Sequence, residues 1–68
     1  MLTRQDLKPG LRCNWIGQSE RLIYMGTKHY RGFDTRTWFQ FSLVGEDPEV
    51  CWCEVLESDL SGFEITKE

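Results

Sequence analysis

The residues of this chain best suited to metal chemistry are its three cysteines and its single histidine. Cys51 and Cys53 are separated by one residue, so on a β-strand both thiols would lie on the same face. Cys13 and His29 could then complete a set of four zinc ligands. The paired Cys-x-x-Cys motifs typical of structural zinc sites are absent, however. We therefore expect no metal and no cofactor, and predict that the cysteines pack in the core as small hydrophobic side chains.

Catalytic patterns are also weak in this sequence. A cysteine nucleophile needs a nearby base, and His29 is predicted near the tip of a hairpin. The serines lie in no nucleophile-elbow or phosphate-loop motif. Neighbouring carboxylates such as Glu46 and Asp47 fall in predicted turns, where solvated surface is the simpler interpretation. We expect no catalytic activity.

A basic and aromatic segment is the candidate for nucleic-acid binding. Cations can contact phosphates while aromatic rings stack on bases. The net charge of −3 argues against this function, because nucleic-acid-binding domains are usually basic. A solvated hairpin is therefore the favoured interpretation, and nucleic-acid binding remains the alternative. The residues concerned are Lys28, His29, Tyr30, Arg31 and Arg36.

Length and composition limit the possibilities further. A chain of 68 residues makes one domain, residues 1–68, with an expected ordered core at about 7–66. So small a core leaves little room for an enclosed active site, which favours binding across an outer surface. The first residues contain no apolar signal segment, and three cysteines do not suggest a disulfide framework. We expect a cytoplasmic protein.

The charges are distributed unevenly along the chain. Residues 1–36 hold seven lysines or arginines and three acidic residues, whereas residues 37–68 hold one lysine and eight acidic residues. Folding can mix the two halves or leave a basic and an acidic face. Separate faces would suit head-to-tail self-association or an anionic partner.

Two segments, 38–44 and 50–56, are predicted to form a β-hairpin. Both are rich in aromatic and β-branched residues, and the loop between them, 45–49, has turn-forming residues. With Val44 opposite Val50, one face contains only apolar pairs, and a shift of one residue would destroy that sorting. The predicted pairs on that face are Leu43 with Cys51, Phe41 with Cys53, and Phe39 with Val55. The other face is mixed, with Ser42 opposite Trp52, Gln40 opposite Glu54, and Trp38 opposite Leu56.

The rest of the chain alternates short strands with turns. The alternation in 11–16 predicts a half-buried strand whose polar face carries Arg12 and Asn14. The segment 21–27 has no polar face, which predicts a central strand, with Tyr24 opposite Phe41 and Gly26 making room for the Phe39 ring. A single tight helical turn at 57–62 with Leu60 inward and a closing strand at 63–66 complete the prediction.

This order of strands and turns resembles the SH3-like barrels, which include Tudor and KOW-type domains and the type II dihydrofolate reductase subunit. The resemblance covers about residues 7–66 and implies an all-β, five-stranded small barrel. The reductases use a Val-Gln-Ile-Tyr stretch on a late strand. The corresponding segment here, 50–55, reads Val-Cys-Trp-Cys-Glu-Val, so no catalytic residue is carried over.

The outer face of the predicted hairpin carries apolar side chains that need a cover. Exposed tryptophan is a frequent interface anchor, so we predict a protein-interaction module or a self-associating protein, for instance a homodimer. The two tryptophans lie roughly 13 Å apart at strand rise, too far to form one aromatic pocket alone. Such a pocket would need Trp15, Tyr24 or Tyr30 to join one of them. A ligand site formed between subunits of an oligomer is a third hypothesis. The predicted partner-binding residues are Trp38, Trp52, Val44, Val50 and Leu56.

Overall fold

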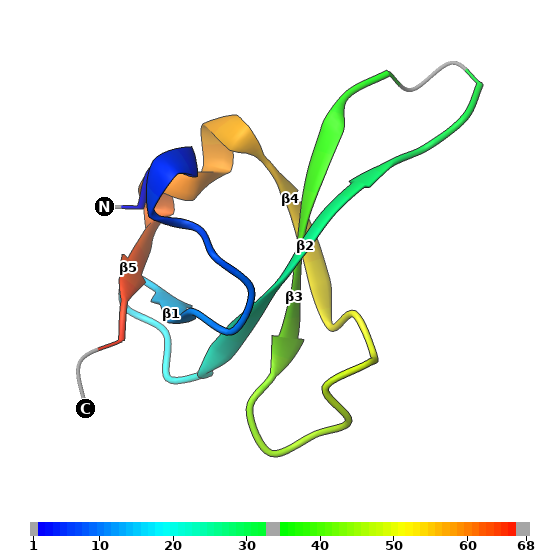
Figure 1. Ribbon diagram of the computed structural model, residues 1–68. Coiled ribbons are helices and arrows are strands. Elements are labelled where there is room, and N and C mark those ends of the chain that lie inside the picture. Colours follow the sequence, from blue (N-terminus) through cyan, green and yellow to red (C-terminus); the bar gives the residue numbers. More distant parts are fainter. Residues whose placement is uncertain (1, 33–34, 67–68) are drawn as a thin grey trace.

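A computed structural model describes residues 2–32 and 35–66 of the chain. Its five strands form one antiparallel sheet in the order β4-β3-β2-β1-β5 (Figure 1). The predicted all-β domain of five strands is confirmed. The strands are β1 (Arg12–Trp15), β2 (Leu22–His29), β3 (Thr37–Leu43), β4 (Cys53–Leu56) and β5 (Phe63–Ile65), and the two 3-10 helices are η1 (Arg4–Asp6) and η2 (Glu57–Gly62).

The hairpin of β3 and β4 has the predicted register over its four observed pairs. Phe39 faces Val55 and Phe41 faces Cys53. The pairs of the other face, Trp38 with Leu56 and Gln40 with Glu54, also form as predicted. Phe39, Phe41 and Val55 are buried, which places this face against the core. The apolar sorting of the two segments was therefore sufficient to fix this part of the sheet.

Nearer the loop, the predicted pairing of this hairpin is wrong. Strand β4 begins only at Cys53, so the pairs of Leu43 with Cys51 and Val44 with Val50 do not form. Two tight turns explain the difference, because the Leu43 carbonyl accepts from the Glu46 N–H and the Asp47 carbonyl from the Val50 N–H, each at 3.1 Å. These turns carry the chain away from β3. Cys51 is consequently exposed and does not pack in the core.

The pairing of β2 with β3 contains a β-bulge between Tyr24 and Gly26. Tyr24 lies opposite Phe41 as predicted, but Gly26 lies opposite Gln40, and Thr27 takes the place opposite Phe39. A Cβ atom on Gly26 would meet nothing within 4 Å, so the prediction that this glycine makes room for a ring is wrong. Its φ of +138° gives the physical reason for glycine, since the bulge requires a backbone conformation that other residues rarely adopt.

The core is a cluster of aliphatic and aromatic side chains on one side of the sheet, closed by η2. The Phe41 and Phe63 rings stack with centroids 4.9 Å apart, and Leu60 of η2 is buried beside them as predicted. Leu2, which precedes the expected ordered core, is also buried. The buried members of the core are Leu2, Cys13, Leu22, Tyr24, Phe39, Phe41, Val55, Leu60 and Phe63.

Two polar residues depart from the predicted faces. Ser42, expected on the mixed face, is buried, and its hydroxyl has no hydrogen-bond partner in the described part of the chain. Asn14, expected on the polar face of its strand, is buried too. Its amide donates to the Glu64 carboxylate at 3.1 Å, and its carbonyl oxygen accepts from the Thr66 hydroxyl at 2.7 Å. Asn14 therefore ties β1 to the end of the chain, which is why burial of this polar residue is tolerated.

The sheet is not closed as a barrel, in contrast to the predicted architecture. The described strands β4 and β5 are its two edges and have only four and three residues. The helix η2 joins β4 to β5, as Figure 1 shows, and its residue Leu60 is buried. A helical turn with a buried leucine thus connects the two edge strands whose pairing would close a barrel. In residues 2–32 and 35–66, no helix is long and apolar enough to cross a membrane.

Candidate binding surface

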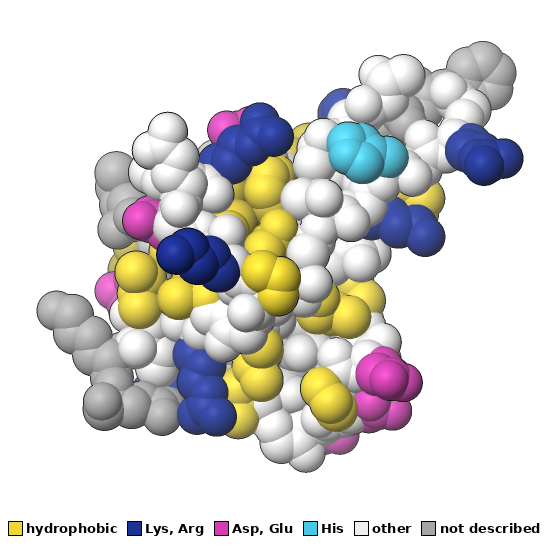
Figure 2. All heavy atoms as spheres, in the orientation of Figure 1, with side chains coloured by type: hydrophobic (Ala, Val, Ile, Leu, Met, Phe, Trp, Pro, Cys, Tyr) yellow, Lys and Arg dark blue, Asp and Glu magenta, His cyan; other side chains and the backbone are white. Residues whose placement is uncertain are grey.

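Opposite charges lie at the two ends of β3. At one end, β2 and β3 extend into a projecting hairpin, and we call its described residues 28–32 and 35–36 the arm (Figure 1). At the other end, the loop between β3 and β4 carries the exposed acidic side chains Glu46, Asp47 and Glu49. Figure 2 shows Lys and Arg side chains around the arm and Asp and Glu side chains gathered at the far end of the same strands. Part of the charge asymmetry of the sequence therefore survives folding.

The nucleic-acid candidates Lys28, His29, Tyr30, Arg31 and Arg36 are all exposed on the arm. Several of them already interact within the chain. The Lys28 ammonium lies 5.8 Å from the centre of the Tyr30 ring, and the Arg36 guanidinium lies 5.1 Å from that of Trp38. Both distances are within the range of cation–π contacts. The aromatic rings at the arm therefore already have cationic neighbours from the same chain.

A short hydrogen bond ties the arm to β4. The Tyr30 hydroxyl donates to Glu54 Oε2 at 2.6 Å, and the Gln40 amide donates to the same oxygen at 3.1 Å. The bond to the carboxylate favours the protonated phenol and raises the pKa of Tyr30 above its usual value. A negative charge consequently lies at the base of this basic segment.

The five predicted partner-binding residues fall into two groups. Trp52 and Val50 are exposed, at 48% and 56%, and lie next to the acidic residues of the loop. Val44 is half-buried. Trp38 and Leu56 lie opposite each other near the arm and are also half-buried. The structure therefore offers a partner mainly the end of the hairpin that contains Trp52.

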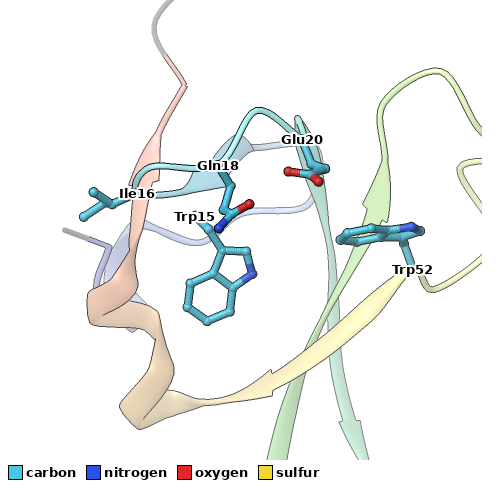
Figure 3. A pocket seen from close by; sticks show the side chains of 5 residues that line it. All are labelled: Trp15, Ile16, Gln18, Glu20 and Trp52. Carbon is cyan, nitrogen blue, oxygen red and sulfur yellow. The ribbon is translucent and has the colours of Figure 1, made fainter.

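Trp52 separates two surface hollows. We call the first the tryptophan hollow; it has a volume of about 300 Å³ and is lined by Trp15, Ile16, Gln18, Glu20 and Trp52. Figure 3 shows the indoles of Trp15 and Trp52 on either side, with the Gln18 side chain next to Trp15 and the Glu20 side chain above the gap that separates the indoles. The second hollow, of about 220 Å³, is lined by Leu43, Glu46, Asp47, Val50 and Trp52. One exposed indole thus contributes to two adjoining depressions, and each also has a carboxylate in its lining.

The walls of the tryptophan hollow are held by the fold. Trp15, at the end of β1, packs on Phe63 with ring centroids 4.0 Å apart. Gly62 lies so close to the same indole that an added Cβ would come within 2.8 Å of Trp15 Cζ3. On the opposite wall, the Trp52 backbone N–H donates to the Phe41 carbonyl at 2.8 Å. The Trp15 indole is therefore fixed by its packing, and the backbone of Trp52 is fixed by its bond to β3.

The cysteines are poorly placed for reactive chemistry. Burial raises the pKa of Cys13 to about 12 and that of Cys53 to about 11, so both thiols are protonated at neutral pH. Burial also raises the pKa of Cys51, although this residue is largely exposed. His29 lies on the arm. Within the described ranges, no three His, Cys, Asp or Glu side chains come close enough to hold a metal ion.

Sequence reasoning did not identify the tryptophan hollow as a unit. Trp15 was predicted as one of three aromatic residues able to join a hairpin tryptophan. In the structure, Trp15 and Trp52 line the same hollow. Glu20 and Gln18 were missed, because they looked like ordinary turn residues between two strands. The hollow joins the turn after β1 to the residue before β4. Such a juxtaposition depends on the topology of the sheet and leaves no periodic signal in the sequence.

Comparisons of the chain with protein-family models, with curated proteins and with solved structures find no match.

Proposed function

We propose that this protein is a non-catalytic binding domain that contacts a protein partner through the surface around Trp52. The observation that carries the proposal is the position of this indole, which is half exposed, adjoins exposed Val50 and separates two hollows. Tryptophan contributes strongly to binding when a partner removes it from water, particularly beside pockets that the partner can fill.

The surroundings of Trp52 support the same proposal. Its backbone is bonded to β3, and Trp15 across the hollow is packed on Phe63, so the surface changes little on binding. The acidic residues nearby provide a polar rim and select the charge of the partner. The half-buried Trp38 and Leu56 extend the surface toward the arm and contribute less, since the Arg36 guanidinium lies over the Trp38 ring.

The test compares two equally exposed apolar side chains. Trp52 and Ile65 are both 48% exposed, but Ile65 lies on edge strand β5 and lines neither hollow of Trp52. The full-length wild type, Trp52→Ala and Ile65→Ala would each be immobilised, and the proteins retained from the native cell extract quantified. Sedimentation velocity of each protein alone would measure self-association.

We expect Trp52→Ala to lose a retained protein, or a self-associated species, that wild type and Ile65→Ala keep. Amide NMR spectra of the variants would establish that both remain folded. Identical retention and identical sedimentation of all three proteins would contradict the proposal.

Nucleic-acid binding by the arm is a second candidate, favoured by one observation. Lys28 and Arg31 are exposed on a hairpin that projects from the domain. A labelled mixed-sequence oligonucleotide would be titrated into the isotope-labelled protein at low and moderate salt. The candidate predicts shifts confined to the arm, an affinity that falls steeply with salt, and weaker binding by Arg31→Ala on all sequences alike. Absence of arm shifts at low salt would eliminate it.

A further inference from the structure

The tryptophan hollow has the composition of a site for an organic cation. Two indoles form its opposite sides, and the Glu20 carboxylate lies at the edge of the gap that separates them (Figure 3). The face of an indole carries a partial negative charge that attracts ammonium and guanidinium groups. The carboxylate of Glu20, which is an exposed residue, adds a negative charge to the lining, and attraction between opposite charges is stronger beside apolar walls than in open water.

The neighbourhood of the hollow is acidic as well. The second hollow, which shares the Trp52 wall, is lined by Glu46 and Asp47. Within the described chain, neither hollow has a lysine or arginine in its lining. Arg21 is next to Glu20 in sequence, but its guanidinium donates to the Ser19 carbonyl at 3.3 Å, and it lines an adjoining hollow that shares Gln18. The lining of the tryptophan hollow is therefore acidic and can accept a cation from another molecule.

The volume and openness to solvent of the hollow favour a side chain over a larger ligand. At about 300 Å³ it is at the small end of ligand sites, and exposed Ile16 and Gln18 form its rim. A long flexible side chain can place its charge between the indoles while its methylene groups lie along Trp15 or Ile16. An anionic ligand would be repelled by Glu20, and a large ligand would extend beyond the walls.

We infer that the tryptophan hollow binds the arginine or lysine side chain of a protein partner, held between Trp15 and Trp52 and paired with Glu20. The inference rests on the proposed function and specifies the chemistry of the partner. A basic segment of the partner would also be attracted by Glu46, Asp47 and Glu49, so the acidic loop adds charge complementarity around the same indole.

The test uses blocked tripeptides as probes on the full-length, isotope-labelled protein. Acetyl-Gly-Arg-Gly-amide and its lysine counterpart carry the cation, and the citrulline counterpart is a neutral isostere of arginine. The indole N–H signals of Trp15 and Trp52, assigned with the Trp→Phe variants, would be followed through each titration. We expect saturable shifts of both indoles, with the arginine or lysine peptide binding about 2- to 30-fold more tightly than the citrulline peptide.

Two charge-neutralising variants serve as a matched pair. Glu20→Gln removes the charge inside the hollow, whereas Glu49→Gln removes one from the exposed loop outside it. We expect Glu20→Gln to weaken the cationic peptides several-fold and to leave the citrulline peptide unchanged, with Glu49→Gln having the smaller effect. Equal effects of the two variants would overturn the assignment of Glu20, since the attraction would then come from the general acidity of the surface.

Three other outcomes would overturn the inference. Equal affinity for arginine and citrulline peptides would indicate an apolar site, and unmoved indoles with every probe would indicate no site for such side chains. Indole shifts that depend on protein concentration and that the cationic peptides do not reverse would show that a second copy covers the hollow without placing a cation in it. The proposed function fails separately, because it requires that Trp52→Ala lose a retained protein or a self-associated species whatever the tripeptides do.

Discussion

The arm and the tryptophan hollow both combine aromatic rings with charged groups, yet they differ in what their rings contact. At the arm, Lys28 and Arg36 lie over Tyr30 and Trp38, and Tyr30 is bonded to Glu54. At the hollow, the Trp15 ring packs on Phe63, the Trp52 backbone is bonded to β3, and both residues line an open depression. A mixture of aromatic and charged residues in the sequence thus indicates a site only where the fold leaves the rings accessible.

The two regions also differ in how they are stabilised. The hollow is built on the core, since Trp15 stacks on Phe63, which stacks on Phe41. The described part of the arm consists of exposed residues at the ends of two strands and has no buried side chain. We therefore expect substitutions behind the hollow to affect both folding and binding, and substitutions on the arm to act locally.

The largest effect is expected from Phe63→Ala. Phe63 is fully buried between Trp15 and Phe41, and removal of a buried phenylalanine ring typically costs about 3–5 kcal/mol. Domains of this size have a total stability of only a few kcal/mol, so the variant should be largely unfolded. Urea titration followed by tryptophan fluorescence would measure the change. The milder Phe63→Leu should remain folded with a lower midpoint, and a Phe63→Ala variant with the wild-type midpoint would contradict this account of the hollow.

Gly62→Ala is expected to distort the hollow without destroying the fold. The added methyl group would lie 2.8 Å from Trp15 Cζ3, so the indole must shift. Overpacking of this kind typically costs about 1–3 kcal/mol. We expect a lower urea midpoint, an altered Trp15 indole signal and weaker binding of the arginine tripeptide. The neighbouring Ser61→Ala, at an exposed position, is the control. An unchanged Trp15 signal in Gly62→Ala would show that the wall of the hollow is not rigid.

The difference between the regions also shows how far the sequence could be interpreted. The register of the four observed pairs of β3 with β4 and the burial of Leu60 were predictable, because alternation and turn residues determine them locally. The bulge at Gly26, the early turns after Leu43 and the bridging of the sheet edges by η2 were not. They depend on which backbone N–H and C=O groups form hydrogen bonds with segments distant in the sequence. The pairing of Trp15 with Trp52 is of the same kind, since it joins residues on different strands and loops.

Alkaline pH is expected to lower the unfolding free energy of the domain through ionisation of Cys13 in β1. Burial raises the pKa of Cys13 from the ordinary 9.0 to about 12, with a smaller contribution from Cys53. The raised pKa means that the folded state holds the thiol proton more tightly. This contribution to stability is complete below pH 9 and is lost as the pH rises toward 12. One such group changes the unfolding free energy by at most about 1.4 kcal/mol per pH unit.

Urea unfolding at a series of pH values would measure this slope. Cys13→Ala should lower the stability at pH 7, because it leaves a cavity, but should show a shallower decline above pH 9. Cys51→Ala, which removes an exposed thiol, is the control and should decline nearly as the wild type does. Parallel slopes for wild type and Cys13→Ala would contradict the assigned role of Cys13.

The smallest effect is expected from Tyr30→Phe on the arm. This change removes the hydrogen bond to Glu54 but no buried surface, so the urea midpoint should not change measurably, while amide exchange in residues 28–32 should become faster. Because the folded-state pKa of Tyr30 is raised, wild type keeps the bond below the unfolded tyrosine pKa of about 10 and loses it as the pH rises through the folded pKa. In Glu54→Gln the amide oxygen can still accept the bond, but the Tyr30 pKa should return toward its ordinary value, as phenolate absorbance would show. A Tyr30→Phe midpoint lowered as far as that of Gly62→Ala would mean that the arm is part of the stabilising core. The contrast between an exposed arm and a core-supported hollow would then be lost.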